Sequence, residues 1–373
     1  MADPIGKTIE SYDPKASLVE ASTPPASWYT DPRVLELEQR TVFAHSWQMV
    51  GRVDQVIEVG RYVTGEIGGE PILVVRGNDD VLRGFFNVCR HHAAAVLPHA
   101  EGKVQILRCP YHGWTYDLEG KLVVTPEFGG VENFDREDFG LQSVRVAQWH
   151  GGLFVNLDNA AVSLDDFLGL EILEPFERLN LERFHWFERR HYTLHCNWKV
   201  FVDNYLDGGY HVPHIHGGLN SVLDYGNYTI ETGERFCLQS SPISKEQSGS
   251  PTAAVRQGER ALYYWIYPNF MINIYDQVMD TNLVVPRAVD CTEGIFDYYF
   301  ADVSEPARER DLASIAISEQ IQSEDVAICE SVQRGLRSRS YNAGRLSVRR
   351  EAGEHLFHRL LYADVHAGLS VKK

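Results

Sequence analysis

The chain has 373 residues, and a content of 44% hydrophobic and 11% aromatic residues is sufficient for two packed domains and too high for a disordered protein. Its formal net charge of −17 argues against nucleic acids and anionic membrane surfaces as partners. No run of about 18 apolar residues is present, so we expect neither a transmembrane helix nor a membrane partner.

The N-terminal segment, residues 1–45, predicts a loose arm followed by a helix that begins near Asp31 and Pro32. Its first residues include several acids and lack the apolar stretch of a secretory signal, and a transit peptide to an organelle would be poor in acids. The cysteines outside the motifs described below are scattered singly, so no disulfide framework is visible. We therefore expect a cytoplasmic protein.

Residues 46–158 contain short runs of strand-forming residues separated by Gly, Asn and Asp, a pattern that is typical of a small all-β domain. The clearest runs are 62–64, 71–75, 84–88 and 152–156. Two short motifs that combine cysteine with histidine fall at strand ends within this domain, and they are the most informative feature of the sequence.

The two motifs are C-R-H at residues 89–91 and C-P-Y-H at residues 109–112, with seventeen residues between them. Each motif supplies one thiolate and one imidazole. The four candidate ligands are Cys89, His91, Cys109 and His112. Two cysteines on one iron and two histidines on the other are the ligands of a Rieske 2Fe-2S cluster, so the motifs predict a redox protein.

Two other interpretations of these motifs fit less well: a zinc site, and buried residues that only pack. A structural zinc site usually has C-x2-C or H-x3-5-H pairs, whereas each motif here is mixed. Gly113 would let the backbone turn close to the sulfurs, and Trp114 can shield them from water. His92 stands where the Rieske pattern often has arginine, a change that removes no ligand.

Residues 159–373 predict a second domain that mixes helices and strands. A strand at 189–198 leads into a helix at 199–210, and a long helix is expected from about 308 to 336. Further strands are expected near 229–230, 236–238, 261–268, 271–275, 282–285 and 295–300. The polar stretch 240–256 between them predicts a loop or lid.

A second candidate metal site lies just after the helix predicted at 199–210. His211 and His216 are five residues apart, and Pro213 between them would break a helix and let both imidazoles converge. His214 is a rival for either place. Two histidines and one carboxylate bind non-haem Fe(II) and leave positions open for oxygen and substrate.

The third ligand is expected from the long helix. Its predicted apolar stripe consists of Ile321, Ile328, Val332 and Leu336. Asp325 lies roughly on that stripe, whereas Glu324 lies to its side and Glu330 roughly opposite. A charged group on a buried face needs a partner, and a metal ion is a suitable one, so Asp325 is favoured over an acid at the edge of the stripe.

An aromatic segment on a predicted strand is a candidate substrate pocket. Tyr263, Trp265 and Tyr267 alternate and therefore share one face of the strand, and Phe270 follows. These rings could form an aromatic box around a trimethylammonium group, where each well-placed ring contributes on the order of 0.5–2 kcal/mol. The alternatives are ordinary sheet core and a pocket for a planar aromatic substrate.

Together these residues resemble the α subunits of the Rieske non-haem iron oxygenases, and the similarity covers nearly the whole chain. Within that family the chain is most similar to the quaternary-ammonium hydroxylases of the choline monooxygenase type. The stretches that carry the resemblance are 197–201, 203–207, 210–213, 266–270, 324–326 and 329–336. The two metal motifs are specific for the family, and the match to the choline branch is less specific about the substrate.

The resemblance implies an α+β chain in three parts. Residues 1–45 form an arm and helix that pack with the catalytic domain, residues 46–158 an all-β Rieske 2Fe-2S domain, and residues 159–373 a mononuclear-iron catalytic domain. This last domain is expected to have a helix-grip fold, in which an antiparallel sheet wraps on a long C-terminal helix. A ring-shaped homotrimer is also implied, in which the cluster of one subunit feeds the iron of its neighbour through a bridging carboxylate.

Many members of the family place the bridging carboxylate three residues before the first iron histidine, where this chain has Gly208. The nearest acid is Asp207, four residues before His211. Both positions would face much the same way on a helix, so Asp207 is expected to hydrogen-bond His211 and a cluster histidine, with an acid on the helix surface as the alternative. Asn204 is expected to orient the iron site.

Three hypotheses of function follow, with a Rieske 2Fe-2S cluster and mononuclear Fe(II) as cofactors and O2 as co-substrate. The first is a monooxygenase that hydroxylates a carbon next to nitrogen in a small choline-like or betaine-like N-methyl compound. The second is a ring-hydroxylating oxygenase acting on an aromatic acid, and the third an electron carrier without oxygen chemistry. No GxGxxG lies between a strand and a helix, so a separate NAD(P)H-dependent reductase or ferredoxin is implied.

Overall fold

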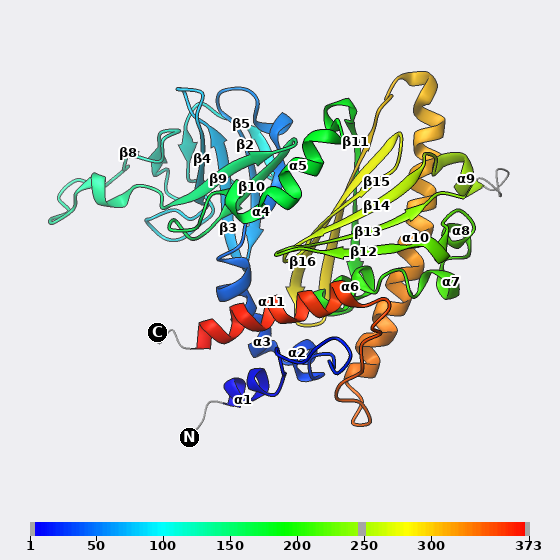
Figure 1. The fold of residues 1–373 in the computed structure, drawn as a ribbon. Helices are drawn as coiled ribbons and strands as arrows, with labels where there is room; N and C mark the ends of the chain where they lie inside the picture. The colour runs from blue at the N-terminus through cyan, green and yellow to red at the C-terminus, as the bar shows by residue number, and fades with distance from the viewer. Residues whose placement is uncertain (1–3, 245–250, 370–373) are drawn as a thin grey trace. The chain divides into compact units, whose positions relative to one another are not determined.

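The structure is a computed structural model that describes residues 4–244 and 251–369 (Figure 1). The chain divides into two compact units. Residues 39–167 form one, here called the β unit, and residues 1–38 with 168–373 form the other, the α+β unit. This combination confirms the predicted α+β class. None of the helices in the described ranges is long and apolar enough to cross a membrane.

The β unit is built on a seven-stranded antiparallel sheet with the strand order β1-β10-β9-β4-β3-β2-β5. The strands are β1 (Gln48–Arg52), β2 (Arg61–Ile67), β3 (Glu70–Arg76), β4 (Leu82–Phe86), β5 (Glu101–Lys103), β9 (Ser143–Trp149) and β10 (Gly152–Asn156). The apolar run 72–75 in β3 is completely buried, as expected for a short strand inside a core.

A second, three-stranded sheet carries one of the two cysteine–histidine motifs. Its strands are β6 (Leu107–Arg108), β7 (Thr115–Tyr116) and β8 (Leu122–Val124). Trp114 and Tyr116 are 1% and 0% exposed and belong to the same hydrophobic cluster as Cys89 and Cys109. The small sheet shares this apolar cluster with Tyr62, Leu73, Val75 and Phe85 of the large sheet, and the cluster surrounds both thiols.

The α+β unit contains a seven-stranded antiparallel sheet with the strand order β11-β17-β16-β15-β14-β13-β12. The strands are β11 (His185–Leu194), β12 (Thr229–Thr232), β13 (Phe236–Pro242), β14 (Arg260–Ile266), β15 (Phe270–Ile274), β16 (Val278–Ala288) and β17 (Cys291–Phe300). Neighbouring strands from β12 to β17 follow one another in the chain, so this part of the sheet is a simple meander.

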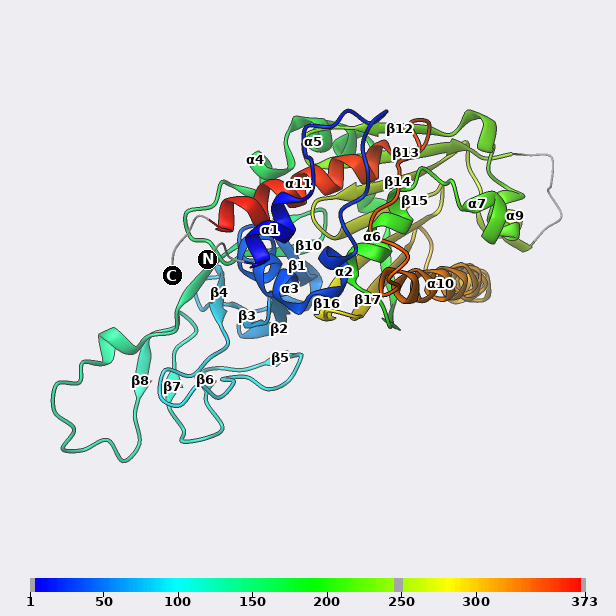
Figure 2. The same ribbon diagram turned by 90° about the horizontal axis from the view of Figure 1, so that it is seen from below.

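Three helices pack with this sheet and define the site: α6 (Trp198–Leu206), α10 (Arg308–Leu336) and α11 (Ala352–Leu369). Helix α6 contacts both of the others and β16, and it lies between α10 and α11 (Figure 2). The remaining helices are α1 (Pro4–Glu10), α2 (Ser27–Thr30), α3 (Pro32–Glu38), α4 (Leu164–Leu168), α5 (Leu170–Arg178), α7 (Val212–Ile215), α8 (Gly217–Asn220) and α9 (Pro251–Val255).

The polar stretch 240–256, predicted as a loop or lid, is only partly irregular. Its first residues belong to β13, and residues 251–255 form α9. Residues 245–250 lie outside the described ranges. Arg256, at the end of the stretch, is 3% exposed, so this end of the segment is part of the core of the α+β unit.

The buried face of α10 differs from the predicted apolar stripe. It consists of Asp311, Ser314, Ile315, Gln322, Asp325, Cys329, Gln333 and Leu336. Val332 is 44% exposed, and Ile321 and Ile328 are only half-buried. Polar partners select this face: Gln333 Oε1, for example, accepts a 2.8 Å hydrogen bond from the backbone N–H of Asn197 at the start of α6. Hydrophobic periodicity does not detect such a face.

A buried ion pair joins α3 to α6. Lys199 Nζ lies 2.7 Å from Glu38 Oε1, and both side chains are 0% exposed. Trp198 Nε1 donates to the other carboxylate oxygen at 2.8 Å. Burial raises the pKa of Glu38, and the opposite charge of Lys199 counteracts this shift. The pair is therefore stable only while both partners are present.

We predict that Lys199→Met destabilises the α+β unit by about 3–5 kcal/mol, because it leaves the Glu38 carboxylate buried without a cation. The double variant Lys199→Met/Glu38→Gln should recover most of this loss, since a neutral amide can still accept from Trp198. Thermal unfolding monitored by circular dichroism measures both. Equal destabilisation of the single and double variants would contradict the argument.

Candidate metal centres and the adjoining cavity

The first candidate centre lies in the β unit, where the two cysteine–histidine motifs meet. Cys89 follows β4, and residues 109–112 form the turn between β6 and β7. The two thiols are 3% and 2% exposed, and they are close enough for a side-chain hydrogen bond. The ring centroids of His91 and His112 lie 4.7 Å apart. The structure thus brings together all four predicted cluster ligands.

The surroundings of these four side chains fit a cluster with thiolates on one iron and imidazoles on the other. Nδ1 of His91 is buried and has no hydrogen-bond partner among the described residues, as expected for a nitrogen reserved for a metal ion. The His91 ring stacks on Trp114 at 4.7 Å. Gly113 has φ +73°, so the turn uses the left-handed conformation that glycine adopts without strain.

Tyr116 is a further residue of this centre that the sequence did not reveal. Its hydroxyl oxygen lies 3.4 Å from Cys89 Sγ and accepts a 3.0 Å hydrogen bond from the backbone N–H of Arg90. Because that N–H occupies an acceptor position, the phenolic hydrogen is available to the sulfur. No spacing rule marks a tyrosine seven residues after the second cysteine. His92 is exposed, and its ring lies 4.1 Å from that of His91.

The second candidate centre lies in the α+β unit and consists of His211, His216 and Asp325. One ligand atom from each of these residues lies within 4.8 Å of the other two. Asp325 Oδ1 is 3.1 Å from His216 Nε2 and 3.7 Å from His211 Nε2. The imidazole rings are 4.9 Å apart and nearly perpendicular, at 82°. His214 is exposed and is not part of this group.

Each imidazole is fixed by a carboxylate on its other nitrogen. His211 Nδ1 pairs with Asp207 Oδ2 at 2.6 Å, and His216 Nδ1 pairs with Glu324 Oε2 at 2.6 Å. Such hydrogen bonds are typical of metal-ligating histidines, because they leave the free electron pair of Nε2 directed at the metal. Glu324, which the sequence placed to the side of the helix, thus contributes to the site.

Asn204 and the charge of the site complete the arrangement. Asn204 Nδ2 donates a 2.8 Å hydrogen bond to Asp325 Oδ1. Burial lowers the pKa of His216, but hydrogen bonds and charges from Asp325 and Glu324 outweigh burial and raise it. The site therefore attracts positive charge. Its donor set of two imidazoles and one carboxylate suits Fe(II) with open coordination positions.

Two glycines explain how Asp207 reaches His211 from four residues away. Helix α6 ends at Leu206, so Asp207 is its C-cap rather than a residue inside the helix. Gly208 and Gly209 both have φ +67°, and a side chain on Gly208 would collide with the backbone of Arg350. The chain turns here, and the Asp207 carboxylate accepts from the backbone N–H and pairs with the ring of His211.

Pro213 plays a different part from the one predicted. It does not break a helix between the two histidines, because α6 has already ended before His211. It lies in the first turn of α7 instead, where proline is favoured because its missing N–H would have no partner in the helix. The short helix α7 then carries the chain from His211 to His216.

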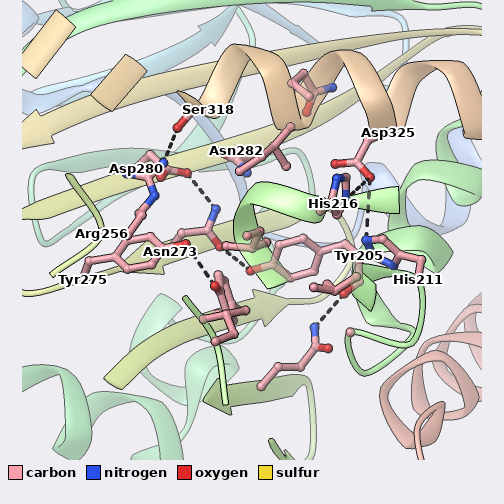
Figure 3. Close-up of a pocket in the computed structure, with 18 of the residues that line it drawn as sticks. Tyr205, His211, His216, Arg256, Asn273, Tyr275, Asp280, Asn282, Ser318 and Asp325 are labelled. Atoms are coloured by element: carbon pink, nitrogen blue, oxygen red, sulfur yellow. Dashed lines mark hydrogen bonds and ion pairs between the residues drawn. The ribbon is translucent and has the colours of Figure 1, made fainter. Parts of the chain in front are cut away.

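A cavity of about 120 Å³ adjoins the histidines (Figure 3). The candidate ligands His211, His216 and Asp325 lie at one end of it, and Arg256, Asp280 and Ser318 lie at the other (Figure 3). The aromatic residues along its walls are Phe201, Tyr205, Tyr228, Tyr263, Tyr275 and Phe296. The cavity is thus mostly apolar with charged groups at both ends, as is usual for a small-molecule site.

Only one of the four aromatic residues predicted for the pocket lines this cavity. Tyr263 does so, whereas Trp265, Tyr267 and Phe270 are buried elsewhere. The face that Tyr263 shares with Trp265 continues beneath α11, where the Trp265 ring packs 5.6 Å from Phe357. The strand alternation was therefore correct, but the cavity occupies only one end of that face, and the rest is sheet core.

Asp280 is a buried carboxylate that the sequence analysis missed. Its side chain is almost inaccessible to solvent and accepts a 2.7 Å hydrogen bond from Asn273 Nδ2. Burial raises the pKa of Asp280 to about 6, against the opposing effects of Arg256 and Asn273. Asn273 Oδ1 in turn accepts from Tyr205 at 2.7 Å (Figure 3). A polar chain therefore runs along the cavity wall from Asp280 towards the histidines.

Comparison with known proteins gives two family matches. Residues 46–135 match the Rieske [2Fe-2S] domain, and residues 181–366 match the catalytic domain of the ring hydroxylating alpha subunit. The two matches cover the two candidate centres respectively. The chain therefore carries a Rieske 2Fe-2S domain and a non-haem iron catalytic domain.

Individual proteins are similar over almost the whole chain. Choline monooxygenase of Arabidopsis thaliana chloroplasts is 40% identical and covers 97% of this chain and 87% of its own. The oxygenase subunit of carnitine monooxygenase from Escherichia coli K12 is 34% identical over 86% of each chain. A solved quaternary ammonium Rieske monooxygenase superimposes with a TM-score of 0.82 at 29% identity, covering 93% of this chain and 96% of its own.

Replacing Tyr116 by Phe should lower the reduction potential of the cluster. The variant loses the hydrogen bond from the Tyr116 hydroxyl to Cys89 Sγ, and hydrogen bonds to sulfur favour the reduced, more negative cluster. Redox titration followed by electron paramagnetic resonance measures the shift. Iron content should remain unchanged, and Tyr111→Phe, whose side chain is 64% exposed, serves as the control. An unchanged potential in Tyr116→Phe would contradict this role.

Asp280 should make the stability of the α+β unit depend on pH. Its folded pKa of about 6 lies above the ordinary aspartate value of 3.8, so its stabilising effect is complete below about pH 4 and is lost as the pH rises through 6. Wild type should therefore lose about 1 kcal/mol of unfolding free energy between pH 5 and pH 7, and Asp280→Asn should not show this decrease. Thermal unfolding at both pH values tests this, with the exposed Asp276→Asn as control. Parallel curves for wild type and Asp280→Asn would refute it.

Proposed function

The chain belongs to the Rieske non-haem iron oxygenases, and we propose that it hydroxylates a small quaternary ammonium or N-methyl compound at a carbon next to nitrogen. The observation that carries this proposal is the cavity beside His211, His216 and Asp325, which combines tyrosine rings with the buried carboxylate Asp280. Rings and a carboxylate are the groups that bind an alkylated ammonium ion. The similar choline and carnitine monooxygenases act on substrates of this kind, according to their names.

The residues of the two centres have separate tasks in this proposal. Cys89, Cys109, His91 and His112 would hold the Rieske cluster, and His211, His216 and Asp325 would hold the mononuclear iron. When bound, the cluster supplies single electrons and the iron supplies open coordination positions for O2 and its activation. The protein orients these ligands through Asp207, Glu324 and Asn204.

The aromatic walls of the cavity keep the reaction away from bulk water. Phe201, Phe296 and Leu219 are among the apolar side chains that line it. An enclosed, mostly apolar site prevents a reactive oxidant from being quenched by solvent and holds the substrate carbon near the reaction centre. The substrate thus has to be small, in keeping with a cavity of about 120 Å³.

We assign the path of the electrons to Asp207. Its carboxylate is bonded to His211 and also lines a second cavity of about 210 Å³, together with Asp203, Asn204 and Glu354. A neighbouring subunit in a homotrimer could present its cluster at this side, and a similar solved monooxygenase has been described with inter-subunit electron transfer. The electrons would come from a separate NAD(P)H-dependent reductase or ferredoxin in the cytoplasm.

Two other functions have less support. Hydroxylation of an aromatic acid would use the same tyrosine-rich walls, but an acid without an ammonium group would leave the buried Asp280 carboxylate without a cation. A Rieske electron carrier would not need the catalytic domain that residues 181–366 match. Hydroxylation at a carbon next to nitrogen is therefore the preferred function.

The direct test is oxygen uptake by the reconstituted protein with a reductase and NADH. Choline, glycine betaine, carnitine and benzoate are supplied separately, and the hydroxylated product or released formaldehyde is quantified against O2. Product formation coupled to oxygen uptake with an N-methyl compound supports the proposal. Coupled turnover of benzoate alone, or of none of these compounds, would overturn it.

Two substitutions should separate iron binding from electron supply. His211→Ala should lower the iron content from three to about two atoms per chain and abolish turnover, because the trio loses one ligand. Asp207→Asn should keep its iron but slow product formation by about 10- to 100-fold, since a neutral amide replaces the carboxylate that pairs with His211 Nδ1. Iron analysis and single-turnover assays measure both. The exposed His214→Ala is the matched control and should behave as wild type.

A further inference from the structure

Arg256 is a buried cation without a carboxylate partner in the described part of the chain. Its side chain is 3% exposed and lines the cavity. The guanidinium donates to Ser314 Oγ at 2.9 Å and to Ser318 Oγ, and it lies 4.5 Å from the centre of the Tyr275 ring. All of these partners are neutral.

The hydrogen-bonding capacity of this guanidinium is not exhausted. Nε of Arg256 is buried and finds no acceptor among the described residues. The hydroxyl groups of Ser314 and Ser318 accept from Arg256, so their own hydrogens remain available to an acceptor. A buried charge with spare donors is costly unless an anion completes it. A carboxylate is the anion whose planar shape suits the guanidinium fork.

Asp280 supplies the opposite charge in the same end of the cavity (Figure 3). Arg256 and Asp280 influence one another electrostatically, but Asp280 has its hydrogen bond from Asn273 rather than from Arg256. The pair therefore offers one positive and one negative position to a ligand. A ligand with a single positive charge would satisfy Asp280 and leave Arg256 without an anion.

The geometry of α10 limits the size of the ligand. Ser318 at the Arg256 end and Asp325 at the histidine end are seven residues apart on this helix, a rise of about 10 Å. Part of this length is needed for contacts to the guanidinium and to the metal ligands. With a cavity of about 120 Å³, the space that remains fits a compact molecule rather than a long chain.

We propose that the substrate is a compact zwitterion of the betaine type, whose carboxylate is bound by Arg256 and whose methylated ammonium group lies between the tyrosine rings and Asp280. This inference rests on the proposed function and narrows it from N-methyl compounds in general to amino-acid-derived betaines. It makes Arg256 the residue that discriminates glycine betaine from choline, which has a hydroxyl group in place of the carboxylate.

The test is binding rather than turnover. Glycine betaine and choline are titrated separately into the iron-reconstituted protein under anaerobic conditions in a calorimeter. Wild type should bind glycine betaine at least about 30-fold more tightly than choline, because only the former places an anion on the buried guanidinium. Tighter or equal binding of choline would overturn the proposal.

Variants then assign the discrimination to individual groups. Arg256→Gln should weaken the binding of glycine betaine by about 30-fold or more and change the affinity for choline by less than about 3-fold. Arg256→Lys should retain part of the preference, because it keeps the charge but loses the fork. Asp280→Asn should weaken both ligands. Arg260→Gln, four residues away, exposed and outside the cavity, is the matched control and should bind as wild type.

The outcomes separate this inference from the proposed function. Equal losses for both ligands in Arg256→Gln would mean that the arginine only ties residues 251–256 to α10, and the inference would fall while the function stands. If Arg256→Gln does not fold, the inference is still tested by the affinities of wild type and of Arg256→Lys for glycine betaine and choline. If glycine betaine binds through Arg256 but causes no coupled oxygen uptake, the carboxylate-binding site at Arg256 would stand and the proposed hydroxylation would be refuted.

Discussion

The α+β unit depends on one carboxylate, Asp325, towards which two imidazole nitrogens from a distant segment converge. The protein fixes the orientation of each imidazole ring through a second carboxylate on its Nδ1. Asp207 holds His211 and Glu324 holds His216. The result is a rigid, electronegative site that is prepared for a metal ion before it arrives.

This requirement explains two unusual features of the surrounding fold. The inner face of α10 is polar because it must supply Asp325, receive Asn204 and bind the start of α6. The chain after α6 contains two successive glycines in left-handed conformation because the histidines must begin immediately after a sharp turn. Both features would weaken an ordinary helix packing, and both serve the site.

The sequence predicted those parts of the site in which ligand chemistry fixes residue type and spacing. Cys89, His91, Cys109 and His112 share a pattern with few alternatives, and the long helix was predicted at 308–336, where α10 lies. The cavity could not be predicted in the same way. Its charged end combines Arg256 after α9 with Asp280 on β16, and only the sheet register brings these together. Tyr116 and Glu324 likewise act through contacts that no local pattern records.

The same sheet register links the fold to selectivity. Asp280 pairs with Asn273 across β15 and β16, and the side-chain bonds continue from Asn273 to Tyr205 on α6, the helix that precedes the histidines. A change of charge at the far end of the cavity is therefore connected to the elements that hold the metal ligands. Because interior hydrogen bonds in a low dielectric are strong and costly to leave unmade, a ligand that neutralises Arg256 also fixes the wall along which it lies. Substrate charge and substrate position are thus determined by one continuous set of contacts.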